Sequence, residues 1–394
     1  MIETPGTESA PASGGGRLRA KPRVHLRFLD GFRGFVALYV VLYHAKLQNW
    51  PEFSGAPGPT GWTRALTSWL SFGELAVTCF IAISGFCLML PVLGNNGTLG
   101  GGGARRFYFR RARRILPPYY MALFLSIAIV AGLGAEHRSE LPGSTGQMTT
   151  AGVLTHLALV HNVNTSTLLQ INGPMWSIAV ECQIYVLFPL LILARRRFGI
   201  LPVVGAIYLL ALVLENQVRD TQHKGLMPIY LFVFLLGMYA AEFALGPPKR
   251  ALIWISGAMA ALLLAMLLFP QLRFIADINV VVGILTSSML VICTQWPGMW
   301  VSRVASWRPI VTIGTFSYSL YLLHVPLQQF LWLDILLPMK LGKVLTFTLG
   351  LTVGTGLIVV FTFLFYLLFE RPFCSAFMKA STASELESSP APSQ

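Results

Sequence analysis

Long apolar segments alternate with short polar ones along most of the chain. A transmembrane helix needs about 20 predominantly apolar residues, and ten segments approach or exceed that length. The pattern therefore predicts an all-α, polytopic bundle of transmembrane helices. The ten predicted membrane spans cover residues 29–48, 68–92, 117–134, 175–194, 200–215, 226–245, 251–269, 278–295, 311–333 and 344–369.

The basic residues orient this bundle. Cytoplasmic loops are enriched in Lys and Arg, and an N-terminus in the cytoplasm puts most of the 29 basic residues on that side. Segment 150–162 is apolar but short. Counting it as a span would move basic residues to the outer side, so we interpret it as re-entrant or interfacial. We expect both termini in the cytoplasm, with a membrane domain at 27–373 and disordered tails at 1–26 and 374–394.

Composition supports a membrane location. The chain is 55% hydrophobic and only 11% charged, whereas soluble domains carry about 25% charged residues. Its net charge of +13 comes largely from clusters between the apolar segments, so orientation in the membrane explains it better than nucleic-acid binding. The five cysteines show no C-x-x-C spacing, and neither a disulfide framework nor a zinc site is expected.

Ionisable residues inside a membrane span are costly and call for a reason. The first predicted span carries Arg33 and His44. Eleven helical steps bring both residues to nearly the same face, about 20° apart, with a rise of about 16 Å. They are candidates for one functional site. The alternative is that Arg33 extends to the inner surface and His44 is an ordinary interfacial histidine.

Two further segments suggest contact with a ligand. Six arginines precede Pro117 and Pro118, which we expect to begin a helix. Arg110, Arg113 and Arg114 of this cluster are close neighbours on a helix, and such a cluster favours an anion. Orientation in the membrane and binding of acidic lipid are the alternatives. Ser84 and its following glycine interrupt another span, where either helix packing or approach to a ligand is consistent with small residues.

Two polar stripes complete the set of candidates. Glu181 lies inside a predicted span and shares a face with Ser177 and Tyr185 at i,i+4 spacing. A carboxylate in lipid needs a cationic partner or a raised pKa, so the stripe is either a functional site or an ion pair that fixes packing. A fainter stripe carries Tyr321 and His324, for which interhelical hydrogen bonding is the alternative.

Six short motifs occur in a characteristic order. They are LDGFRGFVALYVVLYH, CFIAISGF, the arginines before LPPYY, WSIAVECQIY, FSYSLYLLH and FERPF. Together they resemble the acyltransferase-3 family of integral membrane acyltransferases, over roughly residues 27–373. Thr78 is a departure, because an acidic residue is common at that position in the family.

The resemblance implies transfer of an acetyl or another short acyl group from acyl-CoA to a hydroxyl of a glycan or macrolide-type natural product, in a bacterial cell membrane. His44 is the expected general base and Glu181 its orienting partner, with no metal. The expected donor site is Arg33, Ser84, Arg110, Arg113 and Arg114, and the expected acceptor site is Trp176, Ser177, Tyr185, Tyr321 and His324. The outer segment 135–172, with His156 and His161, is a further candidate for shaping the acceptor site.

Two other functions fit parts of this pattern. A transporter or flippase without acyl chemistry would explain many spans and buried charge. It would not explain a histidine-bearing first span beside an arginine-rich cytoplasmic loop. A non-catalytic scaffold would tolerate replacement of His44 and Glu181.

Overall fold

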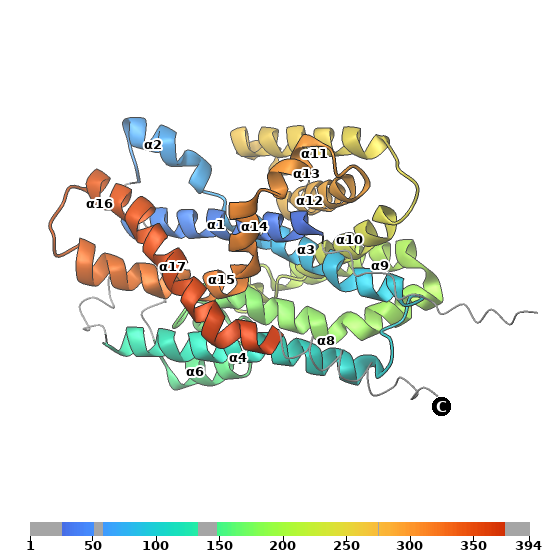
Figure 1. The fold of residues 1–394 in the computed structure, drawn as a ribbon, viewed down its shortest axis with the longest axis horizontal. Helices are drawn as coiled ribbons and strands as arrows, with labels where there is room; N and C mark the ends of the chain where they lie inside the picture. The colour runs from blue at the N-terminus through green and yellow to red at the C-terminus, as the bar shows by residue number, and fades with distance from the viewer. Residues whose placement is uncertain (1–25, 51–57, 133–147, 275, 375–394) are drawn as a thin grey trace, which may run out of the picture.

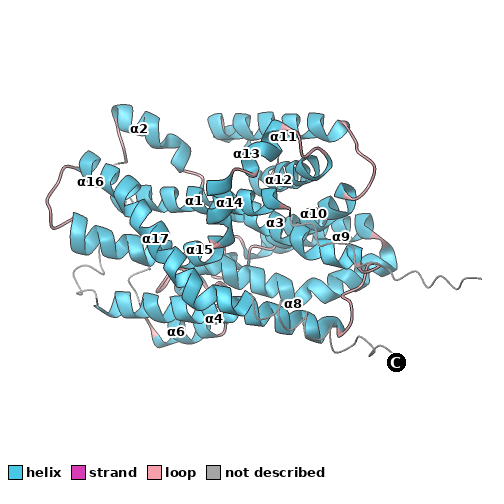
Figure 2. Cartoon of the chain, in the orientation of Figure 1, coloured by secondary structure: helices cyan, strands magenta, loops and turns pink. Residues whose placement is uncertain are grey.

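The fold is a bundle of helices, and no strand occurs among the residues that the structure describes (Figures 1 and 2). The computed structural model describes residues 26–50, 58–132, 148–274 and 276–374. The helices in chain order are α1 (Arg27–Asn49), α2 (Gly61–Thr67), η1 (Ser68–Leu70), α3 (Gly73–Gly94), α4 (Gly103–Gly132), α6 (Thr150–Leu157), α7 (Thr165–Leu168), α8 (Met175–Phe198), α9 (Ile200–Val218), η2 (Lys224–Leu226), α10 (Ile229–Ala244), α11 (Ala251–Leu268), η3 (Pro270–Phe274), α12 (Ile278–Gln295), α13 (Trp300–Ala305), α14 (Arg308–Thr315), α15 (Ser317–Phe330), η4 (Leu331–Leu336), α16 (Lys343–Leu349), η5 (Gly350–Gly354), α17 (Thr355–Phe365) and η6 (Tyr366–Glu370).

Eight helical segments of the described chain are long and apolar enough to cross a membrane, and the bent pair α14–α15 raises the number to nine. The first predicted span corresponds to α1, a 23-residue helix that carries Asp30, Arg33, His44 and Lys46 and is not among these nine. The multi-pass, all-helical prediction is confirmed. The count of ten spans and the cytoplasmic termini stay predictions. The two predicted tails lie almost entirely outside the described residues.

Two predicted boundaries were wrong. The span expected at 311–333 is broken between α14 and α15 with a bend of 77°, and Ser317 Oγ donates to the Gly314 carbonyl at the break. The arginine cluster is helical, so Pro117 and Pro118 lie inside α4 rather than at its start. Segment 150–162 contains only the eight-residue helix α6, which is too short to span a bilayer.

Glycines set the two closest helix contacts. On α1, a Cβ at Gly31 would lie 1.5 Å from the Ala305 carbonyl oxygen, and one at Gly34 would lie 2.2 Å from that of Ile310. Between α3 and α10, a Cβ at Gly85 would lie 2.0 Å from the Phe234 carbonyl oxygen. Small residues let helix backbones approach this closely. Gly85 therefore serves helix packing, while the neighbouring Ser84 is left to face the interior.

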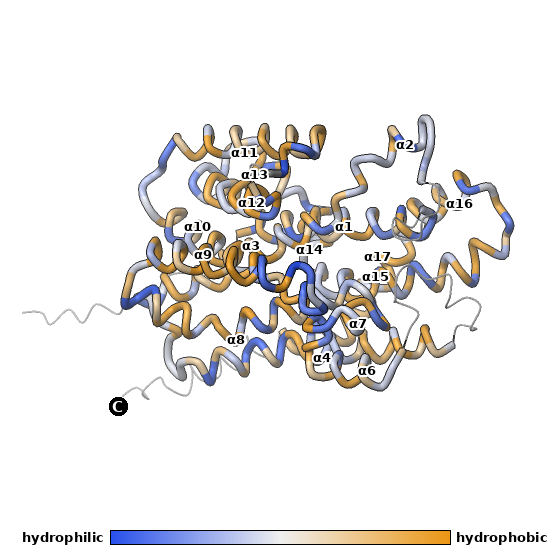
Figure 3. Tube along the Cα trace, turned by 180° about the vertical axis from the view of Figure 1, so that it is seen from behind, coloured by the Kyte–Doolittle hydropathy of each residue, from blue (hydrophilic) through white to orange (hydrophobic). Residues whose placement is uncertain are grey.

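The most exposed helices are apolar. In α9 and α11 only 11% of the most hydrophobic stretch is buried by other parts of the protein. Figure 3 shows both helices as largely hydrophobic, and α11 lies along one edge of the bundle in Figure 1. Exposed apolar surface of this extent is unfavourable in water and favourable in lipid. The bilayer is therefore the environment of these helices.

Candidate active site

A central cavity of about 270 Å³ lies where α1, α3, α4 and α8 meet the α14–α15 bend and η6. Its lining combines charged, hydroxyl and apolar side chains, which is typical of small-molecule sites. The central cavity is lined by Asp30, Arg33, Val77, Phe80, Ile81, Ser84, Cys87, Leu88, Arg111, Arg114, Ile115, Ser177, Ile178, Glu181, Tyr185, Gly314, Thr315, Ser317, Tyr318, Tyr321 and Glu370.

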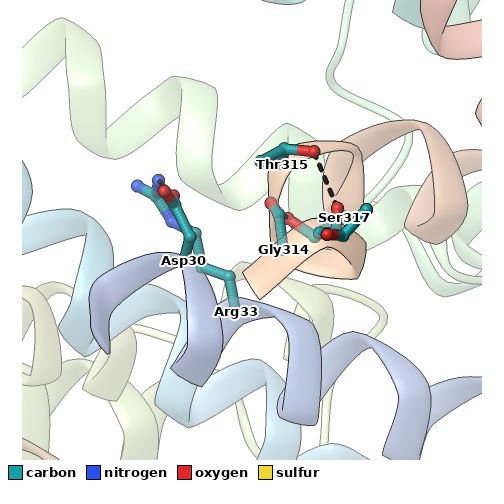
Figure 4. Close-up of polar contacts among 6 residues, drawn as sticks. Asp30, Arg33, Gly314, Thr315 and Ser317 are labelled. Atoms are coloured by element: carbon teal, nitrogen blue, oxygen red, sulfur yellow. Dashed lines mark hydrogen bonds and ion pairs between the residues drawn. The ribbon is translucent and has the colours of Figure 1, made fainter. Parts of the chain in front are cut away.

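Three guanidinium groups contribute to this lining, from Arg33, Arg111 and Arg114. Arg33 lies 3.7 Å from the Asp30 carboxylate, and Figure 4 shows both side chains extending from α1 beside the turn that carries Gly314 and Ser317. The Arg111 guanidinium lies 5.9 Å from the centre of the Tyr185 ring, and its buried Nε has no hydrogen-bond partner among the described residues. Three guanidinium groups, one of them with an unpaired buried Nε, form a favourable site for an anion.

A chain of hydrogen bonds crosses the cavity from α3 to α8. Ser84 Oγ lies 2.6 Å from the Tyr185 hydroxyl, and that hydroxyl donates to Glu181 Oε1. A second contact joins Ser177 Oγ to the Tyr321 hydroxyl at 2.7 Å. Hydroxyl groups therefore hold α3, α8 and α15 in fixed relative positions around the space.

His44 and His324 form a histidine pair one helical turn beyond Tyr321. His324 Nδ1 lies 2.7 Å from the Tyr321 carbonyl oxygen, and its Nε2 lies 3.2 Å from His44 Nδ1. His44 Nδ1 also lies 2.9 Å from the Val40 carbonyl oxygen. A ring nitrogen beside a carbonyl oxygen must carry the proton. His44 therefore holds its proton on Nδ1, and its Nε2 keeps a free lone pair.

Most of the predicted site residues come together. Seven of them line the central cavity: Arg33, Ser84, Arg114, Ser177, Glu181, Tyr185 and Tyr321. The histidine pair adjoins the cavity without lining it. Arg110, Arg113 and Trp176 do not line it either, and Trp176 stacks on Tyr230 with 6.0 Å between ring centres. The contact expected between Glu181 and His44 is replaced by two separate ones, because Glu181 accepts from Tyr185 and His44 contacts His324.

A family profile for an acyltransferase domain matches residues 26–367, nearly all of the helical region. The chain belongs to the acyltransferase-3 family.

Several relatives within this group carry descriptive names. The putative peptidoglycan O-acetyltransferase YrhL of Bacillus subtilis (strain 168) is 23% identical over 330 residues, which cover 76% of this chain and 48% of that protein. O-acetyltransferase OatA of Staphylococcus aureus (strain NCTC 8325 / PS 47) is 22% identical over 331 residues, covering 78% and 51%. The chain spans about half the length of these curated relatives. No solved structure matches it significantly.

The sequence analysis of this acyltransferase-3 chain missed Arg111 and Glu370 among the lining residues. Arg111 follows the buried Phe107 by one turn, just as the predicted Arg114 precedes the buried Pro118 by one turn. Each arginine thus lies one turn from an apolar residue of the buried stripe, and this i,i+4 spacing was the sequence signal that it faces inward. Glu370 accepts hydrogen bonds from the Ser319 backbone N–H at 3.2 Å and from its hydroxyl at 2.5 Å. It belongs to the FERPF motif, but its position in the cavity depends on tertiary packing.

Asn172 anchors α8 beside the histidine pair. Pro326 has no N–H, so the carbonyl of Leu322 lacks its usual helical donor. Asn172 Nδ2 supplies that donor at 2.8 Å and also donates to Ser126 Oγ at 3.0 Å. A polar side chain from another helix thus compensates for a proline inside the membrane. No group of three or more metal-ligating side chains occurs within the described parts of the chain.

His156 and His161 stack on each other with 3.7 Å between ring centres and are fully buried. Burial lowers the pKa of His156 to about 4. Burial and the neighbouring His156 lower the pKa of His161 to about 3. Their region precedes α8 and packs on α4, since the Tyr119 hydroxyl donates to the His156 carbonyl at 2.9 Å.

This stacked pair predicts that acid destabilises the protein. An unfolded histidine has a pKa of about 6.5, so the unfolded chain binds more protons than the folded one between about pH 6.5 and pH 4. The free energy of unfolding is therefore highest above pH 6.5 and falls as the pH drops, on the order of 3 kcal/mol for one such histidine at pH 4. Thermal unfolding from pH 7 to pH 4.5 should show a smaller loss in His161→Phe, which keeps a stacked ring. An equal loss in both proteins would contradict this assignment.

Proposed function

We propose that this chain is a membrane O-acyltransferase that moves an acetyl or another short acyl group from acyl-CoA to a hydroxyl group. The acceptor is a hydroxyl of a glycan or of a macrolide-type natural product. The relatives favour a glycan, since YrhL is described as a putative peptidoglycan O-acetyltransferase. The observation that carries the proposal is an arginine-lined cavity with a histidine pair one turn beyond its far wall.

The arginine end of the cavity suits the phosphates of the donor. Arg33, Arg111 and Arg114 offer several N–H donors to a polyanion. From Arg33 to His44 the rise along α1 is about 16 Å, comparable with an extended pantetheine arm. A donor held by its phosphates at the arginines would therefore bring its thioester towards the histidine pair. In this arrangement the arginine end faces the cytoplasm, where acyl-CoA is found.

His44 is the proposed general base. Its Nε2 takes the proton of the acceptor hydroxyl while the hydroxyl oxygen attacks the thioester carbonyl carbon. The carbon–sulfur bond breaks, the thiolate leaves and takes up a proton as free CoA, and the acyl ester is the product. The Val40 carbonyl and His324 Nε2 both face His44 Nδ1, so they hold the ring and stabilise the cation that forms.

Glu181 has a different proposed role from the one expected from the sequence. It accepts the hydrogen bond of Tyr185, which in turn contacts Ser84. These contacts make Glu181 a residue that shapes the wall of the cavity between α3 and α8. His324 takes over the positioning of His44.

The test is release of CoA by the purified protein in lipid nanodiscs, with acetyl-CoA and either peptidoglycan fragments or a macrolide. We expect release of free thiol that depends on the acceptor, together with an acetylated product by mass spectrometry. A transporter or flippase would give neither. Absence of acetyl-CoA binding would overturn the proposed function in favour of transport.

A further inference from the structure

A second, much smaller cavity of about 20 Å³ lies between α1, the α15–η4 junction, α16 and η5. We call it the amide cavity, after the polar residues in its lining: Gln48, Asn49, Gln328, Trp332 and Thr346. About 10–15 Å³ is enough for one water-sized group. The amide cavity therefore holds one oxygen-centred group, and no more.

The amide cavity and the central cavity lie on opposite sides of the histidine pair. Along α1 the order is Arg33, His44 and then Gln48, which follows His44 by four residues. Along α15 the order is Tyr321, His324 and then Gln328, again four residues later. Both helices thus lead from the central cavity, through the pair, to the amide cavity one turn further on.

The polar atoms of the amide cavity need a ligand. Gln328 Nε2 donates to the Val41 carbonyl at 2.8 Å, which fixes the orientation of its amide. Three polar atoms of the lining are buried without a hydrogen-bond partner among the described residues: Gln48 Oε1, Gln328 Oε1 and Trp332 Nε1. Both glutamines are more than nine-tenths buried. Leaving such atoms unpaired costs free energy, so a bound group that pairs with them is favoured.

The kinds of atoms define the group that fits. Amide oxygens accept hydrogen bonds, whereas the indole N–H of Trp332 only donates one. A hydroxyl does both, because its single hydrogen donates to one of the two glutamine oxygens while its oxygen accepts from the indole. Water, with two hydrogens, can pair with both glutamines and the indole. A phosphate or carboxylate has no hydrogen for the glutamines, and an ammonium has no lone pair for the indole. The ligand is therefore a neutral hydroxyl or water.

We propose that the amide cavity binds a second hydroxyl of the acceptor, while the reacting hydroxyl lies at His44. This inference rests on the proposed function and narrows its acceptor to a polyhydroxylated compound such as a sugar. Four residues along a helix correspond to a rise of about 6 Å, comparable with the distance between hydroxyls on opposite sides of a sugar ring rather than neighbouring ones. Water fills the amide cavity when no acceptor is bound.

The experiment compares Gln48→Met and Trp332→Phe with the wild type, using acetyl-CoA and a peptidoglycan disaccharide as substrates. Each variant removes one polar group and keeps an apolar side chain in its place. We expect the KM for the disaccharide to rise about tenfold, with the KM for acetyl-CoA unchanged. The KM for a monohydric alcohol should not change, because it has no second hydroxyl. Gln295→Met is the matched control, since Gln295 Oε1 is also buried and unpaired but lies on α12.

The outcomes separate this inference from the function on which it rests. Transfer by the wild type with an unchanged KM for the disaccharide in both variants would overturn the inference. A lower unfolding temperature with unchanged KM would mean that the amide cavity holds water only. No transfer by the wild type would overturn the proposed function and this inference with it. The two substitutions lie on different helical segments, so misfolding of one variant leaves the other as the test.

Discussion

Replacing His44 by alanine is expected to lower kcat for acyl transfer by about 10²–10⁴-fold, the usual contribution of a general base. The loss follows because the neighbouring His324 directs its Nε2 towards His44 Nδ1 and not towards an acceptor. Binding of acetyl-CoA should not change, since His44 does not line the central cavity. The measurements are acceptor-dependent CoA release and, separately, the dissociation constant for acetyl-CoA.

The control for this variant is His223→Ala. His223 Nδ1 contacts the Val163 carbonyl at 3.0 Å and lies outside the histidine pair, so its loss should leave kcat within about twofold. His324→Gln should lower kcat less than His44→Ala while leaving both KM values unchanged, as expected of a residue that positions the base. Full turnover in His44→Ala would eliminate His44 as the base.

Replacing Arg111 by alanine is expected to raise the KM for acetyl-CoA by roughly 10–100-fold, because hydrogen bonds to charged groups contribute about 1.5–3 kcal/mol. Arg111 lines the central cavity, and its Nε is buried without a partner among the described residues. A phosphate would supply that partner. The measurement is the KM for acetyl-CoA at saturating acceptor.

Arg113→Ala is the matched control, because it removes the same charge from the same helix. Arg113 does not line the central cavity, so its substitution should leave the KM nearly unchanged. Equal effects in the two variants would show that the arginines act through general charge at the membrane surface. That result would contradict the proposal that the donor binds in the central cavity.

The sequence predicted the helices well because apolar length is a local property. It also predicted which polar residues share a helix face, since Glu181 with Tyr185 and Tyr321 with His324 follow from helical spacing alone. The sequence analysis failed where the prediction depended on how one helix is rotated about its axis relative to its neighbours. Arg110 and Arg111 are adjacent in sequence, and Arg111 faces inward because Phe107, one turn before it, is buried in the packed bundle.

The partner of His44 could not be predicted from the sequence for the same reason. His44, Glu181 and His324 each lie on the expected helix, but their pairing depends on how α1, α8 and α15 are arranged in space. The break between α14 and α15 also depends on tertiary contacts. A Cβ at Gly314 would lie 1.8 Å from the Asp30 carbonyl oxygen, and no local pattern reveals that approach.

The direction of the hydrogen bond between Ser84 and Tyr185 restricts which ligand atoms can contact Ser84. Tyr185 donates its only hydroxyl hydrogen to Glu181 Oε1. The Tyr185 oxygen can then only accept from Ser84, whose single hydrogen is used. Ser84 therefore offers only lone pairs to the cavity. A carbonyl oxygen at this point would be repelled, whereas an amide N–H, of the kind that a pantetheine arm carries, would be held.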